Sequence, residues 1–172
     1  MQILTCTTSD IDVLFWFYDQ AIEYQKKTFG KHWLGFERER VMREIEEGRQ
    51  FKLVRDGEVA AVFLITNDDP VIWKELDKDR AVYLHRIVTH PEHRGKGIVP
   101  IIVEWAREFC RTHQREFIRL DTWLDNTKLV AYYEACGFSF VRNANLDDIS
   151  DLPSHYQWEL ALLQIRVGTR DP

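Results

Sequence analysis

A glycine-containing segment between a β-rich run and an amphipathic helix places the strongest limit on how this chain can fold. Residues 81–89 are typical of a strand, and Gly95 and Gly97 follow in the turn that leads into the helix. Two glycines let the backbone curl so that N–H groups converge on one point, where the helix dipole adds positive charge. Arg94 and Lys96 add whole positive charges. The segment predicts a phosphate-binding loop, and a solvated glycine turn with two incidental basic residues is the other interpretation.

The helix after this loop carries its apolar residues along one predicted stripe. The stripe is formed by Ile98, Ile101, Ile102, Trp105 and Phe109. Pro100 falls in the first turn, where its missing N–H costs little. The loop lacks the spacing of a Walker phosphate loop, and the proline stands where a dinucleotide-binding fingerprint needs its third glycine. Both of these nucleotide-binding classes are therefore excluded.

The remaining patterns predict a mixed α/β chain. A helix is expected over residues 9–28, with Ser9 as its N-cap and Asp12 three residues later, and a second helix over 37–47 ends at Gly48. Asp56-Gly57 between two apolar runs predicts a β-hairpin. The other expected elements are strands at 51–55, 58–66, 117–124, 138–142 and 155–163, a helix at 126–136, and an irregular connection at 67–80. This order predicts a mixed α/β sandwich rather than an alternating Rossmann pattern.

Composition and charge are those of an ordinary globular protein. The 172 residues predict a single domain, 1–172, that can form a core without a disulfide or a metal. Lys plus Arg total 23 against 28 Asp plus Glu, and this acidic balance argues against nucleic-acid binding. The chain contains no long apolar run and no signal core, so we expect no membrane association and a cytoplasmic location. Cys6, Cys110 and Cys136 form no CxxC pair and are expected to be idle thiols.

Two polar residues on the helix predicted at 126–136 suggest a second ligand contact. Asn126 and Tyr133 are seven residues apart, close to two helical turns, so both point from one face. An extended ligand lying along this helix would meet an amide at one end and a phenol at the other. Each residue also has a structural interpretation, in which Asn126 is an N-cap and Tyr133 is a core aromatic.

Taken together, these motifs resemble those of the GNAT superfamily of N-acetyltransferases. The family's acyl-CoA signature is similar to Arg94-x-x-Gly97, and its later pattern of Asn, Tyr and Gly-Phe is similar to Asn126, Tyr133 and Gly137-Phe138. Val99 departs from the signature, which usually has Gly or Ala there. The resemblance implies a mixed, mainly antiparallel sheet of about six or seven strands flanked by about four helices. It covers residues 82–140 in motif detail.

The resemblance also implies a binding site for acetyl-CoA as cosubstrate, without a metal. The backbone of residues 87–89 would bind the pantetheine arm as an added strand. The loop would bind the pyrophosphate, Asn126 would contact the pantetheine, and Tyr133 would lie beside the thioester sulfur. The implied cofactor-binding residues are Ile87, Val88, Thr89, Arg94, Gly95, Lys96, Gly97, Ile98, Val99, Asn126 and Tyr133.

The implied reaction is direct attack of an amine on the thioester, which requires removal of a proton from the amine. An alkyl amine has a pKa of about 10, so only about a thousandth is neutral at pH 7. His85, on the strand face of Tyr83, is a candidate base or a structural histidine. Asp121, on the face of Arg119, is a candidate base, an orienter of His85 or half of an ion pair. Tyr133 is the candidate acid for the departing thiolate.

The acceptor is expected to be an amine of a small molecule or a peptide, and a homodimer is possible. Aromatic residues gather in the first two predicted helices, where the resemblance implies the acceptor pocket, and periodicity assigns about half of them to the core. Two other functions remain open. One is a non-catalytic sensor of acyl-CoA or amines on the same fold, and the other is an interaction module whose glycine loop binds nothing.

Overall fold

The computed structural model describes residues 1–145 and 159–168, which divide into two compact units. The first unit comprises residues 1–65 and 86–98, and the second comprises residues 66–85 and those from 99 onward. One strand, β4 (Ala81–Thr89), begins in the second unit and ends in the first. Among the described residues, no helix combines the length and the apolar character that a membrane span needs.

The first unit holds two helices and an antiparallel part of the sheet. Its elements are β1 (Gln2–Thr5), α1 (Ile11–Thr28), α2 (Arg38–Glu46), β2 (Gln50–Arg55), β3 (Glu58–Thr66) and the C-terminal end of β4. The strand β2 pairs antiparallel with both β1 and β3. Asp56 and Gly57 have φ values of +53° and +86°, the left-handed conformation that a tight hairpin turn needs. The predicted hairpin is therefore confirmed.

Aromatic side chains divide between the core and the surface of the first unit. Phe17 and Tyr18 are buried, and the half-buried Phe15 packs against the same cluster. Trp16 is 41% exposed and stacks on His90, with ring centroids 5.0 Å apart. The expectation that only part of this aromatic group forms core is confirmed.

A charged pair is buried in the same unit. Arg86 donates from Nη1 to Glu44 Oε2 at 2.7 Å and from Nη2 to Oε1 at 2.8 Å. Gln50 donates to the same carboxylate at 2.9 Å, and the guanidinium lies 4.3 Å from the ring centroid of Phe36. The carboxylate is thus held by several donors, which is the condition under which a buried ion pair is tolerated.

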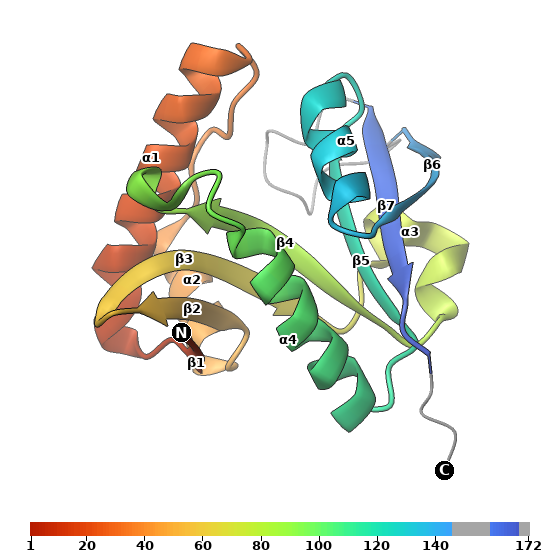
Figure 1. The fold of residues 1–172 in the computed structure, drawn as a ribbon, viewed down its shortest axis with the longest axis horizontal. Coiled ribbons are helices and arrows are strands. Elements are labelled where there is room, and N and C mark those ends of the chain that lie inside the picture. The colour runs from red at the N-terminus through yellow and green to blue at the C-terminus, as the bar shows by residue number, and fades with distance from the viewer. Residues whose placement is uncertain (146–158, 169–172) are drawn as a thin grey trace. The chain divides into compact units, whose positions relative to one another are not determined.

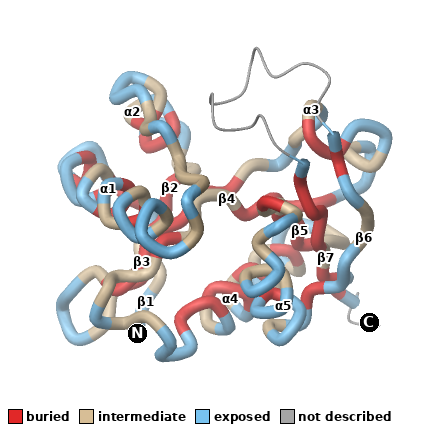
Figure 2. Tube along the Cα trace, turned by 90° about the horizontal axis from the view of Figure 1, so that it is seen from above, coloured by how far each residue is buried: buried red, intermediate tan, exposed pale blue. Residues whose placement is uncertain are grey.

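The second unit holds the remaining helices and strands. Its elements are α3 (Pro70–Trp73), the N-terminal part of β4, α4 (Ile98–Thr112, in this unit from residue 99), β5 (Phe117–Trp123), α5 (Thr127–Ala135), β6 (Ser139–Ala144) and β7 (Leu160–Arg166). The strands β4 and β5 run parallel, whereas β5 pairs antiparallel with β7 and β7 with β6. Figure 2 shows that β5 and β7 are buried along most of their length.

Within the described residues, seven strands form one mixed sheet in the order β1-β2-β3-β4-β5-β7-β6 (Figure 1). The predicted mixed, mainly antiparallel sheet is confirmed. The strand β1 was not among the individual elements predicted from periodicity, because four residues with one half-buried side chain give almost no pattern. The last strand was predicted over 155–163, but it ends at Arg166, and residues 155–158 lie outside the described residues.

The irregular connection predicted at 67–80 is wrong. Pro70–Trp73 forms the short helix α3, and a 3-10 turn over Lys74–Lys78 follows it. The Asp69 side chain caps α3 by accepting from Ile72 N at 3.4 Å, and Pro70 occupies the first turn, which favours a helix start. Trp73 is fully buried and anchors the segment in the second unit.

Two predictions about helix ends and faces are also wrong. Thr7 and Asp10, not Ser9 and Asp12, form the capping box before α1, because a 3-10 turn precedes the helix. On α4 the buried face is rotated from the predicted stripe. Ile98 and Ile102 are buried as expected, but Ile101, Trp105 and Phe109 are half-buried, and the rest of the buried face is Val99, Val103, Ala106 and Cys110. The many adjacent apolar residues of α4 fit more than one stripe.

Candidate active site

Three side chains with acid–base chemistry meet in the second unit. His85 Nε2 lies 3.9 Å from Asp69 Oδ2, and His85 Nδ1 lies 4.0 Å from Asp121 Oδ1. The side chains of Asp69 and Asp121 are 9% and 6% exposed, and that of His85 is 14% exposed. The predicted pair of His85 and Asp121 is thus brought together, and it is joined by Asp69, which the sequence reasoning missed.

The hydroxyl of Thr66 contacts one ring nitrogen of the His85 imidazole. Thr66 Oγ1 donates to the carbonyl of Asp68 at 2.8 Å and lies 3.1 Å from His85 Nε2. A threonine hydroxyl has one hydrogen, and here it points to a carbonyl that only accepts. The Nε2 atom of His85 therefore donates, and in the neutral imidazole this makes Nδ1, on the side of Asp121, the acceptor nitrogen.

Burial controls the protonation of both carboxyl groups. Burial, together with the charge of Asp121, raises the pKa of Asp69 to about 8. Burial raises the pKa of Asp121 to about 7. Arg119, which shares the predicted strand face with Asp121, forms an ion pair with Asp79 instead. Arg119 is thus not the partner of Asp121, whose roles as a base, an orienter of His85 or half of an ion pair stay predictions.

Tyr133 and Asn126 both lie on or at the start of α5. Tyr133 is buried against Phe138, with ring centroids 5.8 Å apart. Burial, with smaller effects from Tyr132, Cys136 and Asp121, raises the pKa of the phenol, so it stays protonated at neutral pH. The Asn126 side chain accepts from Leu129 N at 3.3 Å and caps the helix. The structural interpretation of Asn126 thus holds, and its amide nitrogen keeps its donors for other contacts.

The glycine loop has the backbone conformation that its sequence suggested. Gly95 and Gly97 have φ values of +73° and +71°, and nothing lies within 4 Å of a Cβ placed on either. The need for glycine is therefore conformational rather than steric. The N–H of Lys96 donates to the carbonyl of His93 at 3.2 Å, which engages one of the N–H groups expected to bind phosphate.

The flanking charges of this loop differ in their surroundings. The guanidinium of Arg94 lies 4.0 Å from the ring centroid of Tyr24 on α1, a cation–π contact within the first unit. Lys96 is exposed. Val99, the departure from the signature, is buried in the first turn of α4. Ile98 and Val99 are the first two residues of α4. Their N–H groups therefore have no helical carbonyl one turn earlier to which they could donate.

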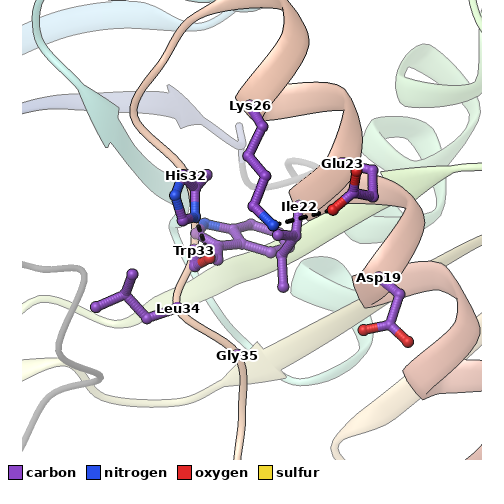
Figure 3. A pocket seen from close by; sticks show the side chains of 8 residues that line it. All are labelled: Asp19, Ile22, Glu23, Lys26, His32, Trp33, Leu34 and Gly35. Carbon is purple, nitrogen blue, oxygen red and sulfur yellow. Dashed lines mark hydrogen bonds and ion pairs between the residues drawn. The ribbon is translucent and has the colours of Figure 1, made fainter.

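A pocket in the first unit is lined by one turn of loop and one face of α1 (Figure 3). Trp33 forms its aromatic part, Asp19 and Glu23 supply carboxylates, and Lys26 donates to Glu23 at 3.0 Å. The free volume is about 380 Å³. The other lining residues are Ile22, His32, Leu34 and Gly35. Part of the aromatic group predicted near an acceptor therefore does line a pocket.

Comparison with known proteins identifies the chain. The model of the acetyltransferase (GNAT) family matches residues 15–138, which include the glycine loop and most of both units. The chain belongs to the GNAT family. An uncharacterized N-acetyltransferase of Bacillus subtilis, YesJ, is 28% identical over 101 residues, 56% of either protein. The chain therefore spans about half, or less, of the length of the curated relatives it matches.

Solved structures of the GNAT fold superpose on almost the whole chain. A GNAT-family acetyltransferase from Listeria monocytogenes has a TM-score of 0.78 at 21% identity, and the match covers 96% of this chain and 94% of that one. The yncA protein of Salmonella typhimurium, solved with its cofactor acetyl-CoA, has a TM-score of 0.68 at 14% identity. That match covers 100% of this chain and 96% of the yncA chain. At these identities the likeness shows the fold.

The sequence carried a signal for Asp69 that was interpreted only as a turn. Asp68-Asp69-Pro70 is typical of a helix start, since an N-cap carboxylate precedes a proline. Recognising α3 would have fixed Asp69 at its N-terminus, but not beside His85, which lies sixteen residues further along this GNAT chain. Thr66, at the end of β3, gave no sequence signal at all.

Proposed function

We propose that this GNAT protein transfers an acetyl group from acetyl-CoA to a primary amine of a small molecule or a peptide. The amine would attack the thioester directly in a ternary complex, without an acyl-enzyme. The observation that carries the proposal is the buried group of His85 and Asp121 in a chain of an acetyltransferase family. The group offers acid–base chemistry that an interaction module would not need, at a cost in stability.

Acetyl-CoA would supply the activated acetyl group, and the chain offers residues suited to hold it. The loop of Arg94, Gly95, Lys96, Gly97, Ile98 and Val99 would bind the pyrophosphate, supported by its positive-φ glycines and the first-turn N–H groups of α4. The segment Ile87, Val88 and Thr89 would bind the pantetheine arm. It is supported by β4, which continues past Tyr83, the last residue in register with β5. Asn126 and Tyr133 would complete the site.

Three chemical tasks would fall to named groups. His85, with the Nδ1 lone pair beside Asp121, would accept a proton from the amine, directly or through water. A backbone N–H of Val88 or Thr89 would donate to the carbonyl oxygen as negative charge develops on it. Tyr133 would give its proton to the departing thiolate, since its phenol is protonated at neutral pH and lies on α5.

An acetyl-CoA consumption screen tests the proposal. Release of free thiol from acetyl-CoA is measured with amines, polyamines, aminoglycosides, amino acids and peptide N-termini as acceptors. Binding of CoA is measured in parallel by calorimetry. The proposal expects CoA binding and turnover with at least one acceptor. Binding without turnover over the whole panel would favour the non-catalytic sensor, and no binding at near-millimolar CoA would favour the interaction module.

A further inference from the structure

The cluster of Asp69, His85 and Asp121 is unusual because its members crowd acceptor atoms together in a buried place. One atom from each residue lies within 4.8 Å of the other two. Within the described part of the chain, Asp69 Oδ2 is buried and has no hydrogen-bond partner, although it is the atom that faces the imidazole. A buried carboxyl oxygen without a hydrogen-bond partner indicates that a polar partner is missing.

In the described part of the chain, the charges that raise the pKa of Asp69 are all acidic. They belong to Asp121, Asp77 and Asp68. Its other oxygen, Oδ1, accepts from Ile72 N at the start of α3, and its own N–H donates to Asp77 Oδ1 at 2.7 Å. The segment is therefore held in position from both sides while Oδ2 points into the cluster.

The spacing of the three side chains can be compared with what two kinds of cation require. A primary ammonium ion donates three hydrogen bonds in tetrahedral directions, and at about 2.8 Å each its acceptors lie about 4.6 Å apart. Ligands of a tetrahedral Zn²⁺ at about 2.1 Å lie about 3.4 Å apart. The ring nitrogens of His85 lie 3.9 Å and 4.0 Å from the two carboxylate oxygens, inside an outer limit of 4.8 Å. These distances lie between the two patterns: an ammonium ion would require the groups to open by about 0.6 Å, and the metal would require them to close by about 0.5 Å. The spacing alone therefore does not choose between the two cations. The proposed acetyl transfer, which needs an amine beside the base, favours the ammonium ion.

We propose that Asp69 and Asp121, beside His85, form the subsite that binds the acceptor amine as its ammonium ion. The inference rests on the proposed acetyl transfer and restricts its acceptors to amines that are protonated at neutral pH. It also assigns a role to Asp69, whose unpartnered oxygen takes one N–H of the ammonium group. Neutral amines such as anilines carry no charge to offset the ionisation of two buried carboxyl groups, so they bind poorly.

The proton balance of the reaction follows from this arrangement. The ammonium ion, R–NH₃⁺, gives one proton to Nδ1 of His85, and the freed nitrogen lone pair forms the bond to the acetyl carbon. The carbon–sulfur bond breaks, its electron pair stays on sulfur, and the thiolate takes a proton from Tyr133. The second proton lost from nitrogen restores the phenol through solvent, and His85 releases its proton to water. The sum is amide, free thiol and one proton.

Binding of simple cations tests the subsite without requiring turnover. Methylammonium chloride is titrated into the whole protein while the imidazole signal of His85, assigned with His85→Asn, is followed by NMR. We expect a saturable shift that tetramethylammonium, which has no N–H, does not produce. Asp69→Asn and Asp121→Asn should each weaken binding about tenfold or more, because each removes a charged acceptor. Asp68→Asn, which removes the smallest of the acidic effects on Asp69, should weaken binding much less than Asp69→Asn.

Kinetics with any acceptor found in the screen provides the second readout. Asp69→Asn should lower kcat/KM for the amine while leaving the KM for acetyl-CoA unchanged. Equal responses to methylammonium and tetramethylammonium, or full binding in Asp69→Asn, would overturn the subsite. The subsite would also be overturned if the protein bound Zn²⁺ through Asp69 but did not bind methylammonium. Specific ammonium binding without any turnover would instead refute the acetyl transfer alone.

Discussion

Replacement of Asp69 by asparagine should make the protein more stable in alkaline solution. The pKa of Asp69 is raised from 3.8 to about 8, first by burial and then by Asp121. Between these two values the folded chain holds a proton that the unfolded chain has released, so stability falls as the pH rises. At about 1.4 kcal/mol per pH unit, the loss between pH 6 and pH 9 is about 2.5 kcal/mol. Asp69→Asn has no proton to lose at this position and escapes this part of the loss.

The measurement compares urea denaturation of the wild type and Asp69→Asn at pH 6 and pH 9. The stability difference between the two proteins should move by about 2.5 kcal/mol in favour of the variant, equivalent to about 5–10 °C in Tm for a chain of this size. Any constant effect of the amide cancels in this comparison. The groups facing Asp69 are Asp121, His85, Asp77 and Asp68. Asp68→Asn removes the smallest of the acidic effects and serves as the matched control, in which the stability difference should move much less than in Asp69→Asn. A difference between wild type and variant that is equal at both pH values would refute the reasoning.

Two further predictions concern the mechanism and the first unit. Tyr133→Phe should lower turnover by about tenfold to a hundredfold if the phenol protonates the thiolate. Tyr132→Phe, which changes the exposed neighbour, should leave turnover unchanged. Unchanged turnover in Tyr133→Phe would remove Tyr133 from the mechanism. Glu44→Ala should cost about 3–5 kcal/mol in urea denaturation, because it leaves Arg86 buried without its partner. The same substitution at the exposed Glu39 should cost less than about 0.5 kcal/mol, and similar losses at both positions would contradict the buried-pair argument.

The strands and long helices were predictable because each carries its own local signal. Asp56-Gly57 fixed the hairpin through the backbone conformation that a tight turn requires, and the structure has that conformation at both residues. Gly48 likewise follows α2, where it has a φ of +68°. The short elements were not predictable, since β1 owes its existence to pairing with β2 rather than to its own pattern. A strand of four residues that is stabilised by pairing with a neighbour has too few residues to show a hydrophobic pattern.

The candidate site was predictable only in part, because its members come from separate elements. His85 and Asp121 lie on strands, and knowing that β4 and β5 are neighbours was enough to expect them near each other. Asp69 lies in the connection between β3 and β4, whose path depends on the burial of Trp73. The role of Thr66 depends on where its single hydrogen points, which no sequence pattern records. What could not be predicted was therefore the spatial arrangement of these residues, not the chemistry of their side chains.

The same carboxyl group accounts for both a loss of stability and a candidate activity. A core that served folding alone would be at least as stable with an amide group where Asp69 stands, since an amide can keep the cap of α3 and burial of a second carboxylate beside Asp121 opposes ionisation. A bound ammonium ion reverses this balance, because its charge compensates both carboxylates and its N–H groups satisfy their oxygens. The unfavourable arrangement is thus relieved only in the complex. If Asp69→Asn is more stable at alkaline pH but binds methylammonium as well as the wild type, this coupling between stability and binding is refuted.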